Sequence, residues 1–406
     1  MVHCKLLLAS EFGTATASFA KEEMVGAYLL DPLKFVTLVS KHSPFICVGG
    51  DAGSGVTKLG ITYLDQSRKQ KFAALFVYSD SDHYDKIIRT TFPNLSPFGG
   101  ESAQFNNIFS FFQFLINQRQ TRQFQVFLNG DWLFMNVVLG LMSPSANYPC
   151  PICVVHRQHL LSTCEPRSAA NQFDASQGQY TIHPGHRALL TIASDHIVPL
   201  PLHLLLGIGN KIILTYLKNL FGPIRLERML QPIKTFHTPG KGGLADMNMY
   251  GLNGPEMTKF IKQFTAMDLF DDVPLDISTT NGEILLKWLE KLHTCLLKKT
   301  EWRPTDLHEF EQLVHHMWSQ WESTSSLKPF PKLHMLRHAW EFADRFKFLG
   351  VASESKIESY HYMHADKQNN HHMNQGRNEA EKQRRSLADT TLIAIQPIVR
   401  AASNPF

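Results

Sequence analysis

Two stretches, Phe45-Ile-Cys-Val-Gly-Gly-Asp51 and Phe124-Gln-Val-Phe-Leu-Asn-Gly-Asp131, decide how this chain is expected to fold. Each is an apolar run of strand length that ends in glycine followed by aspartate. Residues 56–64 and 72–78 between them also have the composition of strands, and residues 106–118 predict an aromatic-rich helix. From residue 43 to about residue 140 the chain is therefore expected to form a mixed α/β unit.

Downstream of this unit the pattern becomes helical. Apolar side chains recur at the spacing of amphipathic helices in residues 202–220, 256–265, 282–299 and 306–322. A last helix is expected to begin near Ser353, after a small-residue turn. The first forty residues give an ambiguous pattern.

Composition restricts the class of protein. Of the 406 residues, 43% are hydrophobic and 19% are charged, so the chain can bury a large core and is not disordered throughout. Six cysteines in a chain of this length are too few for a secreted disulfide scaffold and favour a reducing, intracellular setting. The formal net charge of +4 permits a polyanionic partner without requiring one. No membrane span is predicted.

The strand-end aspartates Asp51 and Asp131 are the first candidate site. Carboxylates are the oxygen ligands that Mg²⁺ takes, and two such ions can stabilise the attacking and leaving oxygens of a phosphoryl transfer. Gly-Asp is also ordinary turn chemistry, which explains either aspartate alone. Near the C-terminus, Glu354 and Glu358 lie at i and i+4 on one helix face, where the helix dipole also favours acids in the first turn.

A phosphate-binding loop is the competing interpretation of the residues around Asp51. Residues 50–57, Gly-Asp-Ala-Gly-Ser-Gly-Val-Thr, have the outline of such a loop. Val56 stands where the loop requires lysine, and Lys58 follows two positions late. Because the contact with the β- and γ-phosphates is then lost, a nucleoside triphosphatase is not expected.

A second candidate site has the spacing of zinc ligands. Cys150 and Cys153 are separated by two residues, which lets two thiolates bind one tetrahedral Zn²⁺, although a redox pair or two buried thiols have the same spacing. His334 and His338 share one helix face and would complete a closed Cys₂His₂ site of the structural type. Three further side chains compete as ligands: His156, His159 and Cys164.

The order of these motifs resembles that of a known family. Residues 130–153 join Asp131, a helical run, a small-residue turn, an aromatic residue and the cysteine pair, while residues 51–55 give the first aspartate an Asp-x-Gly-x-Gly setting. The histidine pair and Glu358-Ser359 follow in the same order. From about Phe45 to Arg377 the chain resembles the catalytic core of the V(D)J recombination-activating recombinase and of Transib-type transposases, in the DDE transposase superfamily.

The resemblance implies an RNase H-like mixed sheet that is interrupted by a large, mostly helical insertion, with a zinc-stabilised C-terminal segment. The expected parts are an N-terminal segment 1–42, the first part of the catalytic unit 43–149, the helical insertion 150–330, which begins with the cysteine pair, and 331–406. This last part would carry the zinc-ligand histidines, the catalytic helix and a polar tail.

The resemblance also implies an enzyme that cleaves and transfers DNA strands with two Mg²⁺ or Mn²⁺ ions. Asp51, Asp131 and Glu358 would bind these ions, with Glu354 as the second choice for the third acid. Structural Zn²⁺ would be bound by the two cysteines and the two histidines named above.

The implied partner is double-stranded DNA, bound by a homodimer in the nucleus, with no membrane and no small-molecule cofactor. DNA-backbone contacts are expected from Arg377, Arg384 and Arg385, for which a solvated surface is an equal interpretation. Little chain precedes Asp51 for the family's N-terminal DNA-end-binding region, so a fragment or a host-retained derivative of a mobile element is expected. Two alternatives stay open: a catalytically inactive, transposase-derived DNA-binding or regulatory protein, and a zinc-stabilised interaction module without a DNA role.

Overall fold

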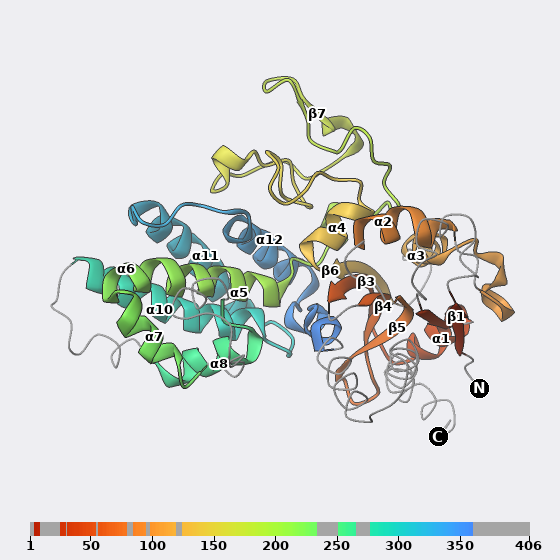
Figure 1. Ribbon diagram of the computed structural model, residues 1–406, viewed down its shortest axis with the longest axis horizontal. Coiled ribbons are helices and arrows are strands. Elements are labelled where there is room, and N and C mark those ends of the chain that lie inside the picture. Colours follow the sequence, from red (N-terminus) through yellow and green to blue (C-terminus); the bar gives the residue numbers. More distant parts are fainter. Residues whose placement is uncertain are drawn as a thin grey trace, which may run out of the picture. The chain divides into compact units, whose positions relative to one another are not determined.

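The computed structural model describes residues 4–8, 25–29, 31–53, 56–78, 84–94, 98–118, 124–233, 251–264 and 277–359. Within them the protein has a mixed α/β structure (Figure 1). Two compact units are formed by the described residues: the first lies within 1–154, 166–198 and 354–406, and the second within 155–165 and 199–353. No helix in the described ranges combines the length and the apolar character needed to cross a membrane.

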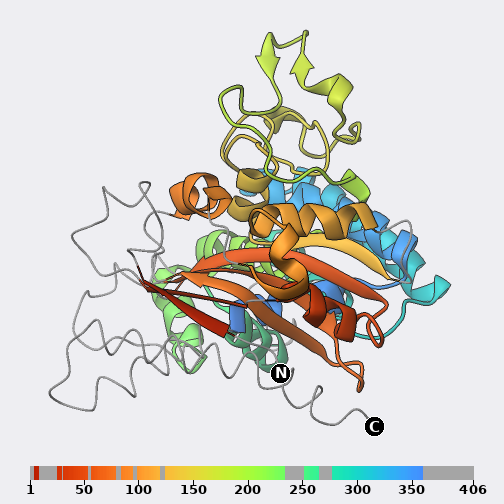
Figure 2. The same cartoon turned by 90° about the vertical axis from the view of Figure 1, so that its right-hand side faces the viewer.

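The first unit is built around a six-stranded sheet with the order β1-β2-β5-β4-β3-β6. Neighbouring strands are antiparallel except β3 and β6, which run parallel. One further pairing lies beyond β6, because Ile197 makes a parallel bridge to Leu128. The strands, seen side by side in Figure 2, are β1 Cys4–Leu8, β2 Val25–Leu29, β3 Phe45–Gly53, β4 Val56–Leu64, β5 Gln70–Tyr78 and β6 Gln125–Gly130.

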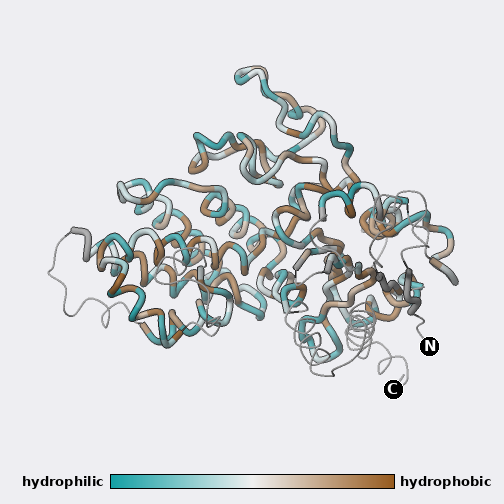
Figure 3. The backbone as a smooth tube through the Cα atoms, in the orientation of Figure 1, coloured by the Kyte–Doolittle hydropathy of each residue, from teal (hydrophilic) through white to brown (hydrophobic). Residues whose placement is uncertain are grey.

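Apolar runs explain why the central strands form the core of this unit. Ile46 of β3 and Phe127 of β6 have no exposed surface, as expected for strands that are covered on both faces. Helix α3, Ile108–Asn117, begins at a capping box in which the Asn107 side chain accepts from the Ser110 N–H at 2.9 Å. Figure 3 shows hydrophobic stretches along the strands, whereas hydrophobic and hydrophilic stretches alternate along the helices.

Shorter elements complete the first unit. Helix α1 follows β2, helix α4 follows β6 directly, and two short strands pair as a separate antiparallel ribbon. Their bounds are α1 Pro32–Val39, α4 Trp132–Val138, β7 Phe173–Asp174 and β8 Gln179–Tyr180.

The second unit is helical, and the four predicted helical runs lie in helices of this unit. Its elements are α5 Pro201–Lys211, a π-helical segment Ile212–Leu217, α6 Lys218–Phe221, α7 Pro223–Leu230, α8 Gly254–Gln263, α10 Ile277–Leu296, α11 Pro304–Ser323 and α12 Pro331–Phe346. Proline stands in the first turn of α5, α11 and α12, where its fixed φ suits a helix start and its missing N–H is not needed. Phe310, Met317 and Trp321 illustrate the buried face of α11.

The close approach of β3 and β6 depends on the backbone of Gly130. Its φ is +134°, and an added Cβ would lie 2.6 Å from the Gly50 carbonyl oxygen and 2.6 Å from Phe134 Cδ1. Gly130→Ala is therefore expected to reduce the free energy of unfolding by about 3 kcal/mol, because both the conformation and the available space exclude a side chain. Urea unfolding measures this change.

Gly178→Ala is the matched control for this prediction. Gly178 also has a positive φ, +60°, but nothing lies within 4 Å of an added Cβ. Its substitution is expected to cost only about 1 kcal/mol, from backbone strain alone. Equal losses in the two variants would contradict the role given to the close approach at Gly130.

Candidate functional site

The cysteine pair is held in a buried turn that follows α4. Cys150 and Cys153 have no exposed surface. The guanidinium of Arg167 donates to the carbonyl oxygens of Tyr148 and Cys150, at 3.0 and 2.7 Å. The Arg167 backbone N–H donates to the Ile152 carbonyl oxygen at 2.9 Å. These bonds fix the backbone on which the two thiols are mounted.

The histidine pair lies on one face of α12. His334 is fully buried and His338 is buried, and their Nε2 atoms are 3.2 Å apart. His334 Nδ1 lies 2.8 Å from the Leu160 carbonyl oxygen, and His338 Nδ1 lies 2.8 Å from Glu341 Oε2. Each Nδ1 is thus engaged by an oxygen acceptor, which orients the ring and directs Nε2 toward the other histidine.

These acceptors determine the tautomers. A carbonyl oxygen can only accept, so His334 Nδ1 carries the proton. Partial burial would raise the pKa of Glu341, but hydrogen bonds from His338 and Arg337 lower it below its usual value, so this carboxylate is ionised and also accepts. Both Nε2 atoms then present lone pairs to each other, and this arrangement needs either a shared proton or a cation between them.

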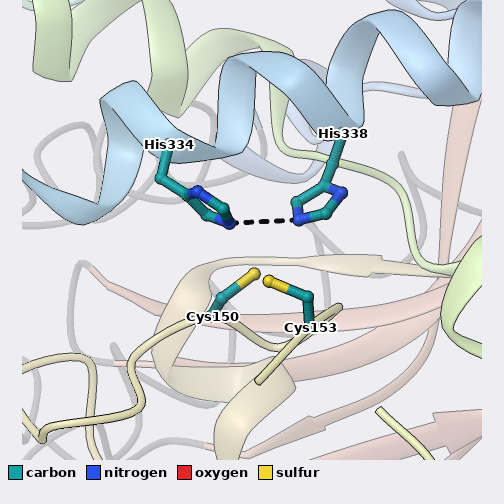
Figure 4. Close-up of side chains that lie close together, drawn as sticks. All are labelled: Cys150, Cys153, His334 and His338. Carbon is teal, nitrogen blue, oxygen red and sulfur yellow. Dashed lines mark hydrogen bonds between the residues drawn. The ribbon is translucent and has the colours of Figure 1, made fainter. Parts of the chain in front are cut away.

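The structure brings the predicted zinc ligands together. The candidate ligand atoms of Cys150, Cys153, His334 and His338, here called the cysteine–histidine cluster, all lie within 4.8 Å of one another. Figure 4 shows the two sulfur atoms directed toward the two imidazole rings. Two thiols and two imidazole nitrogens are the donor set of a tetrahedral zinc site, so the cluster could hold a metal such as zinc.

The competing ligands lie outside this cluster. Cys164 Sγ is 3.9 Å from His334 Nε2, at the edge of the group. His156 accepts from the Gln158 N–H, and its ring centroid lies 6.1 Å from that of His159. Of the donors that the sequence offered, the structure therefore gathers the cysteine pair and the α12 histidines.

Asp131 follows β6, whereas Asp51, which was expected after its strand, lies within β3, because the pairing of β3 with β4 continues to Gly53. β3 and β6 are parallel and place Gly50 opposite Gly130, so the two aspartates follow directly from paired positions. Asp51 is buried, with 4% of its surface exposed. Asp131 caps α4, because its side chain accepts from the Phe134 N–H.

Lys58 is the buried cation of this region. It lies opposite Asp51 in the antiparallel pairing of β3 with β4, and its Nζ is 3.7 Å from Asp51 Oδ2. Its side chain has no exposed surface. Burial lowers the pKa of Lys58 to about 8, and negative charges oppose that shift; in order of effect they belong to Asp51, Glu358 and Asp131. Three carboxylates from separate elements therefore act on one ammonium group.

The third of these acids lies on the helical residues 355–359. Ser355 Oγ donates to Gln70 Oε1 of β5 at 3.2 Å, which holds the start of this helix at the sheet. Glu354 is buried, whereas Glu358, one turn further on, is partly exposed. The charge of Glu358 on Lys58 supports its choice as third acid, and the assignment of a metal ligand between the two glutamates stays a prediction.

Asp51, Asp131 and Glu358 are called the acidic cluster below. Among the residues that the structure describes, the cysteine–histidine cluster alone brings three or more candidate ligand atoms within 4.8 Å of one another. The acidic cluster does not meet this limit. Its oxygen donors suit a hard divalent ion in kind, but they are not assembled around two ions.

Other predicted residues lie outside the described ranges, and Lys58 was missed. Arg377, Arg384 and Arg385, expected to contact DNA, belong to residues 360–406, which the structure does not describe.

Lys58 was not identified as a site residue from the sequence. It was considered only as a lysine that stands two positions beyond the place required in a phosphate-binding loop. A charged residue inside an otherwise apolar strand was the available signal, but its partner depends on the pairing register of β3 with β4.

Comparison of the chain with protein-family models finds no match, and comparison with curated proteins finds none either. Function is therefore inferred from the two clusters, the strand order and the motif order.

Proposed function

We propose that this protein is a DDE-type transposase or recombinase that cleaves DNA strands and transfers them, with a divalent cation bound by the acidic cluster. The observation that carries the proposal is that Asp51 and Asp131 follow the paired residues Gly50 and Gly130, with Glu358 as a third carboxylate whose charge also raises the pKa of Lys58. The three carboxylates come from β3, from the residue after β6 and from the helix at 355–359. Like charges that a fold holds together at a cost in free energy are typical of sites that bind cations or perform chemistry.

The strand order supports the RNase H-like fold that the motif order implies. β5, β4 and β3 are antiparallel neighbours, and β6 is added beside β3 in parallel. Ile197 then pairs in parallel with Leu128, in the position of a further strand. The proposed first two acids follow Gly50 and Gly130, the last paired positions of the parallel strands β3 and β6, which supports a site at this edge of the sheet.

The side chains of the acidic cluster have separable tasks. Asp51 is held in the interior beside Lys58, and Asp131 is oriented by its capping bond to α4. Glu358, which is partly exposed, keeps the cluster accessible to a phosphodiester. A bound divalent cation would supply Lewis acidity to the attacking water or 3′-hydroxyl and to the leaving oxygen. The chain's own contribution is to position these groups and to fix their charge before DNA arrives.

The cysteine–histidine cluster is proposed to hold structural zinc. Four protein ligands fill a tetrahedral coordination sphere, so no position is left for a substrate. The proposal also includes double-stranded DNA as partner, backbone contacts from Arg377, Arg384 and Arg385, a homodimer and a nuclear location. These parts are supported by the motif order alone.

A catalytically inactive, transposase-derived DNA-binding protein is the second candidate. Lys58 is the observation that favours it, since a buried ammonium group beside Asp51 already neutralises part of the charge that a cation would bind. This protein would bind DNA without cleaving it.

Nicking of long duplex DNA distinguishes the two functions. Zinc-loaded wild-type protein is expected to nick supercoiled plasmid in Mg²⁺ or Mn²⁺, because either ion suits the oxygen donors, and to lose this activity when EDTA is added. The measured quantity is the fraction of relaxed circles with time. Plasmid binding by gel shift without nicking in either metal would instead support the inactive DNA-binding protein.

A further inference from the structure

Cys164 lies beside the cysteine–histidine cluster without being one of its four members. Its Sγ is 3.9 Å from His334 Nε2, the nitrogen that carries a lone pair because Nδ1 donates to the Leu160 carbonyl oxygen. The cluster already supplies four ligand atoms, which fill a tetrahedral coordination sphere. Cys164 is therefore a fifth donor next to a site that takes four.

Backbone contacts on both sides restrict the position of this half-buried thiol. Before it in the chain, the Leu160 carbonyl oxygen lies 2.8 Å from His334 Nδ1, so residues 160–164 approach both nitrogens of one imidazole. After it, Pro166 forms an antiparallel bridge with Cys153. The segment that carries Cys164 is thus tied both to a histidine of the cluster and to the turn of the cysteine pair.

The distances around His334 Nε2 are close to those between ligands of one ion. With Zn–S about 2.3 Å and Zn–N about 2.0–2.1 Å at tetrahedral angles, two nitrogen ligands lie about 3.3 Å apart, and a sulfur and a nitrogen about 3.6 Å. His334 Nε2 is 3.2 Å from His338 Nε2 and 3.9 Å from Cys164 Sγ. A weak hydrogen bond from the thiol to Nε2 is the ordinary alternative. The two roles respond differently when His334 is removed.

Cys164 stands outside the group of four, on the side of His334. The group of candidate ligand atoms within 4.8 Å of one another does not include it. A donor in this place reaches the metal most directly at the coordination position of His334. A thiolate is a suitable replacement there, because three cysteines and one histidine form a common structural zinc site.

We propose that Cys164 is a reserve zinc ligand, which takes the coordination position of His334 when that imidazole detaches. The site then changes from two thiolates and two imidazoles to three thiolates and one imidazole. The proton that the thiol releases on binding is available to the detached imidazole. This inference rests on the zinc site of the proposed function and concerns how that site retains its ion. It leaves the roles of Cys150 and Cys153 unchanged.

Cobalt binding to the full-length protein tests the inference without any catalytic readout. Co²⁺ occupies zinc sites, and its thiolate-to-metal charge-transfer absorption increases with the number of bound thiolates. His334→Asn removes the ligand nitrogen but keeps an N–H donor for the Leu160 carbonyl oxygen. This variant is expected to bind one Co²⁺ per chain, with about 1.5 times the charge-transfer intensity of wild type, because three thiolates replace two.

Cys164→Ser is then introduced into two backgrounds. In His334→Asn it is expected to weaken Co²⁺ binding at least about 100-fold, because only three protein ligands remain. In wild type the expected change is less than about threefold, because His334 occupies its own position. Cys295→Ser in the His334→Asn background is the matched control, since Cys295 belongs to no ligand group among the described residues. It is expected to leave Co²⁺ affinity unchanged.

A hydrogen-bonding role for Cys164 predicts a different pattern. Once His334 is replaced, the thiol has lost its acceptor, so its own replacement would have no further effect on metal affinity. Equal Co²⁺ affinities of His334→Asn and the double variant would therefore overturn the inference. A charge-transfer intensity that does not rise in His334→Asn would also overturn it.

Zinc release measures the same role in a chain that keeps all four ligands. Ligands detach one at a time before the ion leaves, and a reserve donor holds the ion while His334 is detached. Cys164→Ser is therefore expected to transfer zinc to excess chelator at least about fivefold faster than wild type. If His334→Asn does not fold, as judged by circular dichroism, this rate decides, and an unchanged or slower release overturns the inference.

The proposed function can fail separately from the reserve ligand. Wild type that binds neither zinc nor cobalt would overturn both the reserve ligand and the proposed structural zinc, whereas intact plasmid nicking would leave the proposed DNA cleavage standing. One bound metal ion without the effects of Cys164→Ser would overturn the reserve ligand alone.

Discussion

Glu358→Gln is expected to lower the rate of metal-dependent DNA nicking by at least about 10³-fold, which corresponds to about 4 kcal/mol of transition-state free energy. The carboxylate of Glu358 is one of three that act on Lys58, and an amide can neither carry that charge nor bind a hard cation as well. Because Glu358 is only partly buried, its replacement is expected to leave folding intact. Plasmid nicking in Mg²⁺ measures the rate, and circular dichroism together with zinc content checks the fold.

Glu354→Gln is the matched variant, one helical turn away. Glu354 is 1% exposed, so its replacement is expected to reduce the free energy of unfolding. The nicking rate of the folded variant is expected to stay within about tenfold of wild type, which corresponds to a change of about 1.4 kcal/mol in the activation free energy. Full nicking by Glu358→Gln together with loss of nicking in Glu354→Gln would reverse the assignment of the third acid. Equal loss in both variants would show that the helix, rather than one carboxylate, is needed.

Cys150→Ser is expected to remove bound zinc, from one ion per chain to none, and to lower the melting temperature by about 10 °C. Structural zinc contributes folding free energy, because its ligands are preorganised only in the native state. A loss of about 3 kcal/mol or more produces a shift of this size in a domain of ordinary length. Atomic absorption gives the zinc content, and differential scanning calorimetry gives the melting temperature.

Cys295→Ser controls for the loss of a thiol as such. Cys295 lies on α10, where burial raises the pKa of its thiol to about 11, so it remains protonated and belongs to no ligand group among the described residues. This variant is expected to retain zinc and to have a melting temperature within a few degrees of wild type, which corresponds to a change of about 1 kcal/mol in the free energy of unfolding. Unchanged zinc content in Cys150→Ser would refute a zinc site at the cysteine–histidine cluster.

Local sequence patterns were sufficient to predict that β3, β4, β5 and β6 exist, because each contains an apolar run bounded by glycine or polar residues. The end of β3 was predicted wrongly, since the strand continues through Asp51 to Gly53. Local patterns were not sufficient for β1 and β2. These strands have five residues each, and the ambiguous pattern of the first forty residues did not define them. Their place in the sheet depends on distant pairing, such as Gly26 with Tyr78, which no local pattern encodes.

The two clusters differed in how far they could be predicted. The spacing of Cys150 and Cys153 was sufficient to predict a candidate metal site. The choice of His334 and His338 among 20 histidines required the motif order as well as the helical spacing. Lys58 depends on register: a shift of one residue in the pairing of β3 with β4 would turn its side chain to the other face of the sheet. The ion pair between Lys58 and Asp51 could therefore be identified only from the three-dimensional structure.

The contact between Ser355 and Gln70 joins positions that are 285 residues apart, and this has a consequence for synthesis. At about 5–20 residues per second, a ribosome needs roughly 15–60 s to travel from one to the other. During this time the nascent chain can already pair β3 with β4 and later β6, but it has no Glu358. A translation product that stops within the helical unit would carry two aspartates and no third acid. If the acidic cluster cleaves DNA, the protein is thus inert until almost all of its described residues have been synthesised.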